Sequence, residues 1–179
     1  MLFLNGGDAL YSPKSLSALL RSASPEDDIV FGNTTVEYEN GLRRPVQAGD
    51  AKRLWRGMVF SQQSSIVRRR LLLGKPFDTA YAIAADYKFY LNCHLNDAKM
   101  KRTNTTVAVS QYGGVSTKRR VASTRERLRV LREAGAPLRH RVFAYISLLH
   151  VLFRTLFERA LGDEGFGRLA RLRYGRSRG

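Results

Sequence analysis

The sequence predicts an α/β domain followed by a basic region of amphipathic helices. Apolar or β-branched runs at residues 2–4, 29–33, 35–38 and 105–110 predict strands, and helical spacing of apolar residues between them predicts flanking helices. Of the 179 residues, 44% are hydrophobic, which is ordinary for a globular domain. Apolar side chains around most of the circumference of 138–161 predict one long helix there.

The charge is concentrated in the last third of the chain. The net charge is +16, and residues 117–179 hold 16 Lys and Arg against 5 Asp and Glu. This imbalance predicts anionic partners, and the basic character is mostly a property of the C-terminal third. The chain has a single cysteine, Cys93, so it forms no internal disulfide, which favours a cytoplasmic location.

The first predicted strand ends in an Asn-Gly-Gly-Asp turn that closes at Asp8. Ligands bind at the carboxyl ends of strands in open α/β sheets, and glycines let the backbone approach a ligand closely. A carboxylate such as that of Asp8 is a ligand that Mg²⁺ or Mn²⁺ prefers, and these ions usually bind together with phosphates. An ordinary strand followed by a glycine-rich turn fits the same residues.

The next elements follow from capping and turn residues. Ser12, which precedes a proline, is the predicted N-cap of a first helix. Strands follow at 29–33 and 35–38, and the Asn-Gly pair at 40–41 predicts a tight turn after them. Residues 42–57, with five basic side chains around one proline and two glycines, are predicted to be an irregular loop.

A helix is predicted around Phe89, Tyr90 and Cys93, with Asp86 in its first turn. The helix dipole favours a negative charge there, so the sequence predicts an ionised carboxylate at neutral pH. One interpretation is that Asp86 only caps the helix; the other is that it acts as a general base.

The predicted strand at 105–110 leads into Gly113-Gly114, and helices follow from 118 onwards. Two interpretations of the long helix at 138–161 remain equal. It lies in the interface of an anionic membrane, or it packs on the domain or on a second subunit.

Four stretches, in the right order, resemble the family 2 glycosyltransferases of the GT-A fold. They are Phe3-Leu4-Asn5-Gly6-Gly7-Asp8, Gln62-Gln63 through Arg68-Arg69, Phe77-Asp78 through Asp86-Tyr87 to Leu91, and Gly113-Gly114-Val115-Ser116. A fifth and weaker likeness is Phe31-Gly32-Asn33. The resemblance covers roughly residues 1–117, and it implies a partial catalytic domain there, followed by a basic helical extension at 118–179. Members of the family carry a further nucleotide-binding half before the first of these stretches.

The resemblance implies a partial GT-A (Rossmann-like) mixed sheet and inverting transfer of a sugar. The donor would be a nucleotide sugar, and the acceptor a saccharide or lipid-linked saccharide of cell-envelope or exopolysaccharide synthesis. It implies that Asp8 holds Mg²⁺ or Mn²⁺ and that Asp86 is the catalytic base. The implied donor and acceptor contacts are Asn5, Gly7, Gln62, Gln63, Arg68, Arg69, Gly113, Gly114 and Ser116. The expected location is the cytoplasm, with peripheral association to the inner face of the cell membrane.

Two other classes of function fit the composition. A basic module for nucleic acid fits the charge, but the chain has no recognised nucleic-acid motif, so no specific nucleic acid is predicted. An inactive remnant that binds a membrane or a partner subunit fits the identity of residue 62, because Gln62 stands where the family has a histidine.

Overall fold

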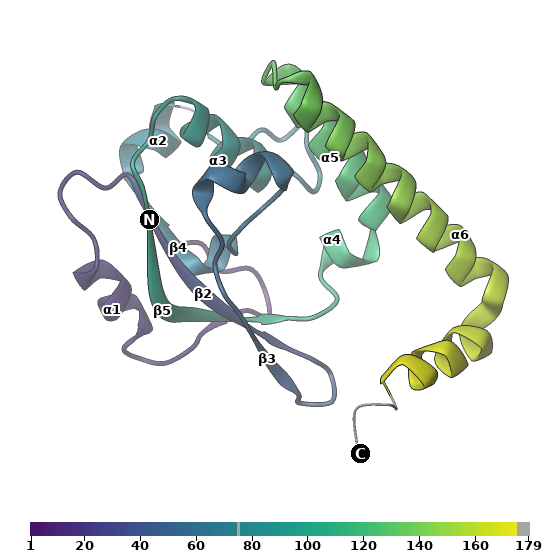
Figure 1. The fold of residues 1–179 in the computed structure, drawn as a ribbon. Coiled ribbons are helices and arrows are strands. Elements are labelled where there is room, and N and C mark those ends of the chain that lie inside the picture. Colours follow the sequence, from purple (N-terminus) through teal and green to yellow (C-terminus); the bar gives the residue numbers. More distant parts are fainter. Residues whose placement is uncertain (75, 175–179) are drawn as a thin grey trace.

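A mixed sheet of 5 strands forms the centre of the fold, with helices on both faces (Figure 1). The structure is a computed structural model. It describes the backbone of residues 1–74 and 76–174, and the side chains of these residues except Ser116 and 158–174. The strands lie in the order β1 (Ala9–Leu10), β5 (Met100–Gln111), β2 (Ile29–Glu37) and β3 (Arg43–Val46), and β4 (Ser65–Val67) also pairs with β2. The predicted α/β class, with a mixed sheet and flanking helices, is confirmed.

The central strands β2 and β5 are parallel, and the other pairs are antiparallel. Side chains of β2 alternate between the two faces of the sheet, as the pleat requires. Ile29 and Phe31 belong to the larger core, and Val30 packs with Leu19 of α1 (Ser15–Arg21) in a smaller one. The parallel pair therefore has a buried core on each face. Because β2 and β5 run in the same direction, their amino ends lie at one edge of the sheet and their carboxyl ends at the other.

Helices cover the larger core and then extend beyond it (Figure 1). This group comprises the 3₁₀ helices η1 (Ala51–Arg56) and η2 (Gln62–Ser64), and the α-helices α2 (Arg69–Gly74), α3 (Ala85–Leu95), α4 (Val115–Lys118), α5 (Arg120–Glu133) and α6 (Leu138–Tyr174). The predicted helix around Phe89 is confirmed as α3, and Cys93 is buried in it. The predicted boundary between residues 117 and 118 falls within α4. Within the described part of the chain, no helix is both long and apolar enough to cross a membrane.

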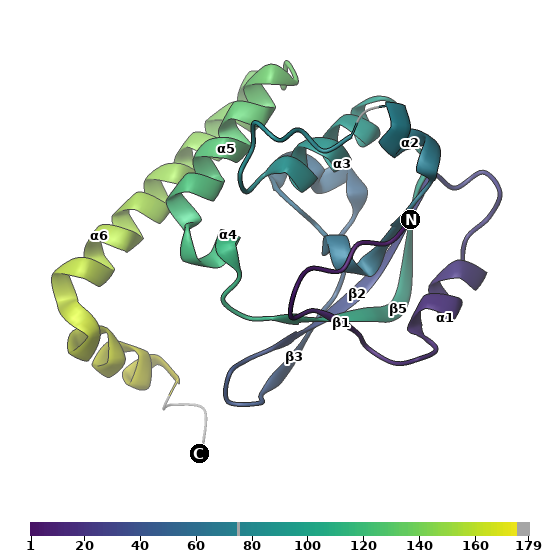
Figure 2. The same ribbon diagram turned by 180° about the vertical axis from the view of Figure 1, so that it is seen from behind.

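The predicted strand at residues 2–4 is wrong, because these residues form no ladder. The first strand is β1, which lies after the glycine turn and pairs with β5 through Ala9 and Val109 (Figure 2). The chain before the turn is held by Met1, whose carbonyl oxygen accepts a hydrogen bond of 2.8 Å from the Val67 N–H. Leu2 packs against the smaller core. The apolar run thus reflects burial of single side chains and not membership of the sheet.

Three further local predictions are corrected by the structure. Residues 42–57 are not an irregular loop, because β3 pairs with β2 and η1 follows. The two strands predicted at 29–33 and 35–38 form one continuous strand, β2. Ser12 is not an N-cap: α1 begins at Ser15, and the two hydroxyls are hydrogen-bonded to each other at 3.1 Å. The predicted turn at 40–41 is confirmed, since the chain reverses there between β2 and β3.

Candidate active site

The carboxylate of Asp8 lies beside Gln63, although 55 residues separate them in the chain. Asp8 Oδ2 accepts a hydrogen bond of 2.6 Å from Gln63 Nε2. The other oxygen, Oδ1, accepts one of 3.3 Å from the backbone N–H of Gln111. The fold therefore brings three separate segments together around one carboxylate: the first turn, the η2 region and the end of β5.

This cluster lies at the carboxyl end of the parallel pair. Gln111, the last residue of β5, is paired with Glu37, the last residue of β2. Glu37 accepts a hydrogen bond from Gln111 Nε2 and another from Arg43 Nε, both of 2.7 Å. The Arg43 guanidinium and the Gln111 amide hold the pKa of Glu37 below its usual value. Ligands bind at this end of a parallel pair, so Asp8 occupies the expected edge although it precedes a strand.

Backbone turns with glycine lie on both sides of Gln111. Gly7 has a φ of 88° and Gly113 a φ of 92°, which is the left-handed region that glycine adopts at no steric cost. A Cβ added to Gly7 would lie 3.6 Å from Gln111 Cγ, so the first turn rests directly on the end of β5. Gly114 is the N-cap of α4, and the carbonyl of Asn5 accepts the Asp8 N–H at 3.0 Å. The Ser116 side chain lies outside the described residues.

The η2 segment connects this edge to α3. The hydroxyl of Ser61 donates to Gln63 Oε1, and the Gln62 carbonyl accepts the hydroxyl of Ser65 at 2.9 Å. That same Ser65 hydroxyl is hydrogen-bonded to the phenol of Tyr90, in α3, at 2.7 Å. The Gln63 amide is thus fixed by Ser61 at its oxygen and by Asp8 at its nitrogen, and the Gln62 backbone is tied to α3 through Ser65.

Asp86 lies in the first turn of α3, as predicted. Its Oδ1 accepts a hydrogen bond of 2.6 Å from the Tyr87 N–H. Burial raises the pKa of the Asp86 carboxyl, which opposes the effect expected from the helix dipole. In the described part of the chain, Asp86 has no ion pair with a Lys or Arg and no hydrogen bond to Asp8 or Gln63. A half-buried carboxylate with a raised pKa and no paired Lys or Arg is the kind of group that acts as a general base.

Arg68 and Arg69 lie at the opposite, amino end of the sheet. Arg68 Nε donates to the Asp27 carbonyl at 2.5 Å, and its Nη2 donates to the Pro25 carbonyl. Its backbone N–H donates to the Asp28 carbonyl, just before β2 begins. Asp8 is hydrogen-bonded to Gln63 and Gln111 instead, and among the described residues no hydrogen bond or ion pair joins either arginine to Asp8. Both line a cavity of about 420 Å³ next to α1.

A second cavity, of about 660 Å³, lies between α2 and α3 and contains none of the predicted site residues. Its polar lining includes Arg70, paired with Asp28 at 2.5 Å, and Lys88, paired with Asp78 at 2.8 Å. These ion pairs occupy the charged groups of the lining except Asp97, which is exposed, so this cavity has the features of a structural space between helices.

Glu126 was not among the predicted site residues, and it supports the Asp86 segment from α5. Glu126 Oε2 accepts hydrogen bonds from the backbone N–H groups of Ile83 and Ala84, at 2.9 and 2.8 Å. These donors lie at the start of α3, where backbone N–H groups have no partner within the helix. Glu126 sits in an arginine-rich run 40 residues further along the chain than Asp86, and no local pattern marks its role.

The described side chains include no cluster of three or more His, Cys, Asp or Glu that could hold a metal ion. Two carboxylates lie at the carboxyl end of the parallel pair, and that of Glu37 is paired with Arg43 and Gln111, which leaves Asp8 as the candidate cation ligand. A single carboxylate fits a cation that takes most of its ligands from phosphates and water, as Mg²⁺ commonly does.

No protein-family model matches the chain, and no curated protein sequence matches it.

Proposed function

We propose that the chain is the acceptor-side portion of an inverting glycosyltransferase of the GT-A fold. The observation that carries this proposal is the meeting of Asp8 and Gln63 at the carboxyl end of β2 and β5, between two glycine turns. The donor is a nucleotide sugar. The acceptor is a saccharide or lipid-linked saccharide, met in the cytoplasm or at the inner face of the cell membrane.

Each residue has a defined task in this reaction. Asp8 holds a divalent cation together with the donor diphosphate, and the cation, when bound, stabilises the charge on the leaving group. Asp86 takes the proton of the acceptor hydroxyl as the oxygen attacks the anomeric carbon. The bond between the anomeric carbon and the donor diphosphate breaks, the diphosphate leaves with the bonding electron pair, and the anomeric centre is inverted. The raised pKa of Asp86 supports its role as the base.

A second candidate is a chain without catalytic activity that only binds a membrane or a partner subunit. Two observations favour it. Both oxygens of Asp8 already accept hydrogen bonds, from Gln63 and Gln111, so a cation has to replace or share these contacts. Gln62 also replaces the histidine of the family motif.

Calorimetric titration with UDP and GDP, with and without Mn²⁺, separates these candidates. The first proposal predicts Mn²⁺-dependent binding that Asp8→Asn abolishes. Asp86→Asn should bind as tightly as the wild type and lose sugar transfer. Asp97→Asn is the matched control, because Asp97 is exposed, lies outside the cluster and has a φ of 58°, which Asn tolerates. Absence of nucleotide binding by the wild-type chain would refute the assignment of a donor site to Asp8. Equal loss of binding in both site variants would mean that Asp86 is structural.

A further inference from the structure

One face of α6 exposes a continuous stripe of large apolar side chains. The stripe consists of Leu138, Val142, Ile146, Leu149, Phe153 and Leu156, which are between 45% and 69% exposed. Successive members are three or four residues apart, so they lie along one side of the helix. A surface helix normally turns polar residues to the solvent, so this side of α6 lacks the usual outer surface.

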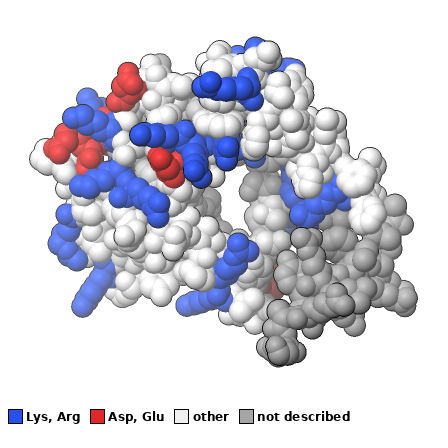
Figure 3. Space-filling model, in the orientation of Figure 1, with Lys and Arg blue, Asp and Glu red and all other residues white. Residues whose placement is uncertain are grey.

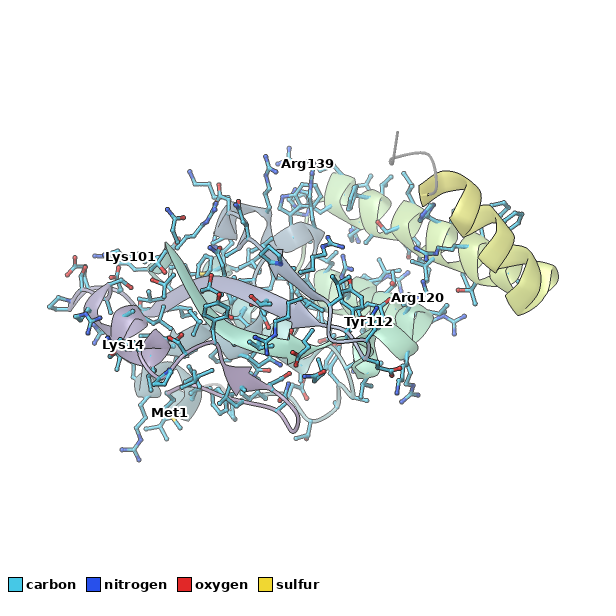
Figure 4. All side chains as sticks on the ribbon, turned by 90° about the horizontal axis from the view of Figure 1, so that it is seen from below. Met1, Lys14, Lys101, Tyr112, Arg120 and Arg139 are labelled. Atoms are coloured by element: carbon cyan, nitrogen blue, oxygen red, sulfur yellow. The ribbon has the colours of Figure 1, made fainter. Side chains whose placement is uncertain are left out.

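The other side of α6 is already packed against the domain. Ala144 is buried, and Leu148 packs against the larger core. At the start of the helix, His140 is stacked on Trp55 with ring centroids 4.0 Å apart. Figures 1 and 4 show α6 as the outermost helix, starting beside Arg139 and running away from the sheet. The apolar stripe therefore faces outward, and no described part of the chain covers it.

The exposed apolar surface is larger than a monomer normally carries. Phe143, Tyr145 and Phe157 are also exposed, by 38% to 46%. With about 200 Å² for each fully exposed large side chain, these side chains and the stripe present on the order of 1,000 Å². The largest apolar patch on a typical monomer is roughly half that size and often functional. A surface of this kind indicates a binding partner.

The charge of α6 identifies the chemistry of that partner. Between residues 138 and 157 the chain has no Asp or Glu, while Arg139 and Arg154 are exposed at the two ends of the stripe. Figure 3 shows Lys and Arg outnumbering Asp and Glu over this whole view of the molecule. A second copy of the chain would add no Asp or Glu from residues 138–157 to pair with these arginines. A polyanion such as DNA would leave the apolar stripe in water. An anionic bilayer provides an apolar interior and negative headgroups together.

We propose that the outward face of α6 docks the chain on an anionic lipid bilayer. The stripe enters the boundary between headgroups and acyl chains, the helix lies in the membrane plane, and the two arginines contact lipid phosphates. This docking surface is independent of the proposed sugar transfer, because none of its residues belongs to the Asp8 cluster or to α3.

Vesicle flotation tests the proposal. The chain should float with vesicles of phosphatidylcholine mixed with phosphatidylglycerol, and bind vesicles of pure phosphatidylcholine more weakly. The double variant Leu149→Glu, Phe153→Glu should lower binding roughly tenfold or more, because two carboxylates replace apolar groups within the contact. Leu73→Glu is the matched control: Leu73 is 71% exposed on α2, and this variant should bind as the wild type does.

Three results would overturn the docking proposal. The wild-type chain could fail to float with the anionic vesicles. The double variant could bind them as well as the wild type does while its circular dichroism spectrum is unchanged. Sedimentation equilibrium could show a wild-type dimer that the double variant converts to a monomer, in which case the stripe is an interface between two copies.

Discussion

Gly32 is the position at which the parallel pairing of β2 and β5 is most easily tested. A Cβ at this residue would lie 2.3 Å from the backbone oxygen of Thr105 and 2.9 Å from Val107 Cγ2. Both atoms belong to β5 and neither is the end of a flexible side chain, so Gly32→Ala has to move the two strands apart by roughly 1 Å. The sheet ladder already changes register between Phe31 and Asn33, which leaves the backbones close there.

The expected cost of Gly32→Ala is at the upper end of the range for overpacking, about 3 kcal/mol. For a chain of this length, that lowers the melting temperature by roughly 6–12 °C. Thermal unfolding followed by circular dichroism measures the shift. Gly6→Ala is the control, because a Cβ at Gly6 meets nothing within 4 Å; this variant should change stability by less than about 0.5 kcal/mol.

Equal melting of the two variants would refute the reasoning. It would mean that β5 does not approach β2 at Gly32. The pairing that sets Gln111 beside Glu37, and with it the position of the Asp8 carboxylate at the carboxyl end, would then be wrong as well.

Two further predictions concern carboxylates of α5. Glu126→Ala should lower the free energy of unfolding by roughly 1–3 kcal/mol, because the N–H groups of Ile83 and Ala84 lose their acceptor. Urea denaturation measures this loss. Glu39→Ala is the control at an exposed site, and a loss for Glu126→Ala no larger than for this control would contradict the prediction. Hydrogen bonds, first of all from Lys88 at 2.6 Å, lower the pKa of Glu133 to about 2. A lowered carboxyl pKa stabilises the fold above the ordinary value of 4.5, and this stabilisation is lost as the pH falls from about 4.5 to about 2. Melting temperatures of Glu133→Gln should therefore fall less over this pH range than those of the wild type, and parallel curves would contradict the assignment.

The strongest sequence signals concerned single elements, and these proved the most predictable. The β-branched and apolar run that begins at Ile29 lies in the central strand, and the helix around Phe89 forms as α3, with Asp86 in its first turn. Both elements are buried on two sides or along most of their length. They therefore need many apolar residues, and a short stretch of sequence is enough to show this. The turn at 40–41 was predictable because its residue types are specific to its backbone conformation.

What the sequence could not show is which elements meet. The apolar run at 2–4 has the composition of a strand, but strand pairing depends on a partner edge, and β5 offers its edge only to Ala9 and Leu10. Arg68 and Gln63 are five residues apart in one motif, yet Arg68 contacts the chain before β2 whereas Gln63 contacts Asp8, because β4 runs antiparallel to β2. The support of α3 by Glu126 is a contact between distant segments and has no local pattern.

Helix α5 connects the candidate active site to the proposed docking surface, so it determines how that site is oriented relative to a membrane. On one side, α5 caps the start of α3 through Glu126 and pairs Glu133 with Lys88. On the other side it packs along α6, where Leu131 and Ala144 are buried in the same core. A core shared in this way resists independent movement, because closely packed side chains lose contacts when either helix shifts. Docking of α6 would therefore set the orientation of the whole sheet on the bilayer and hold the Asp8 cluster at a constant distance from the membrane surface. A flexible tether would leave that distance variable.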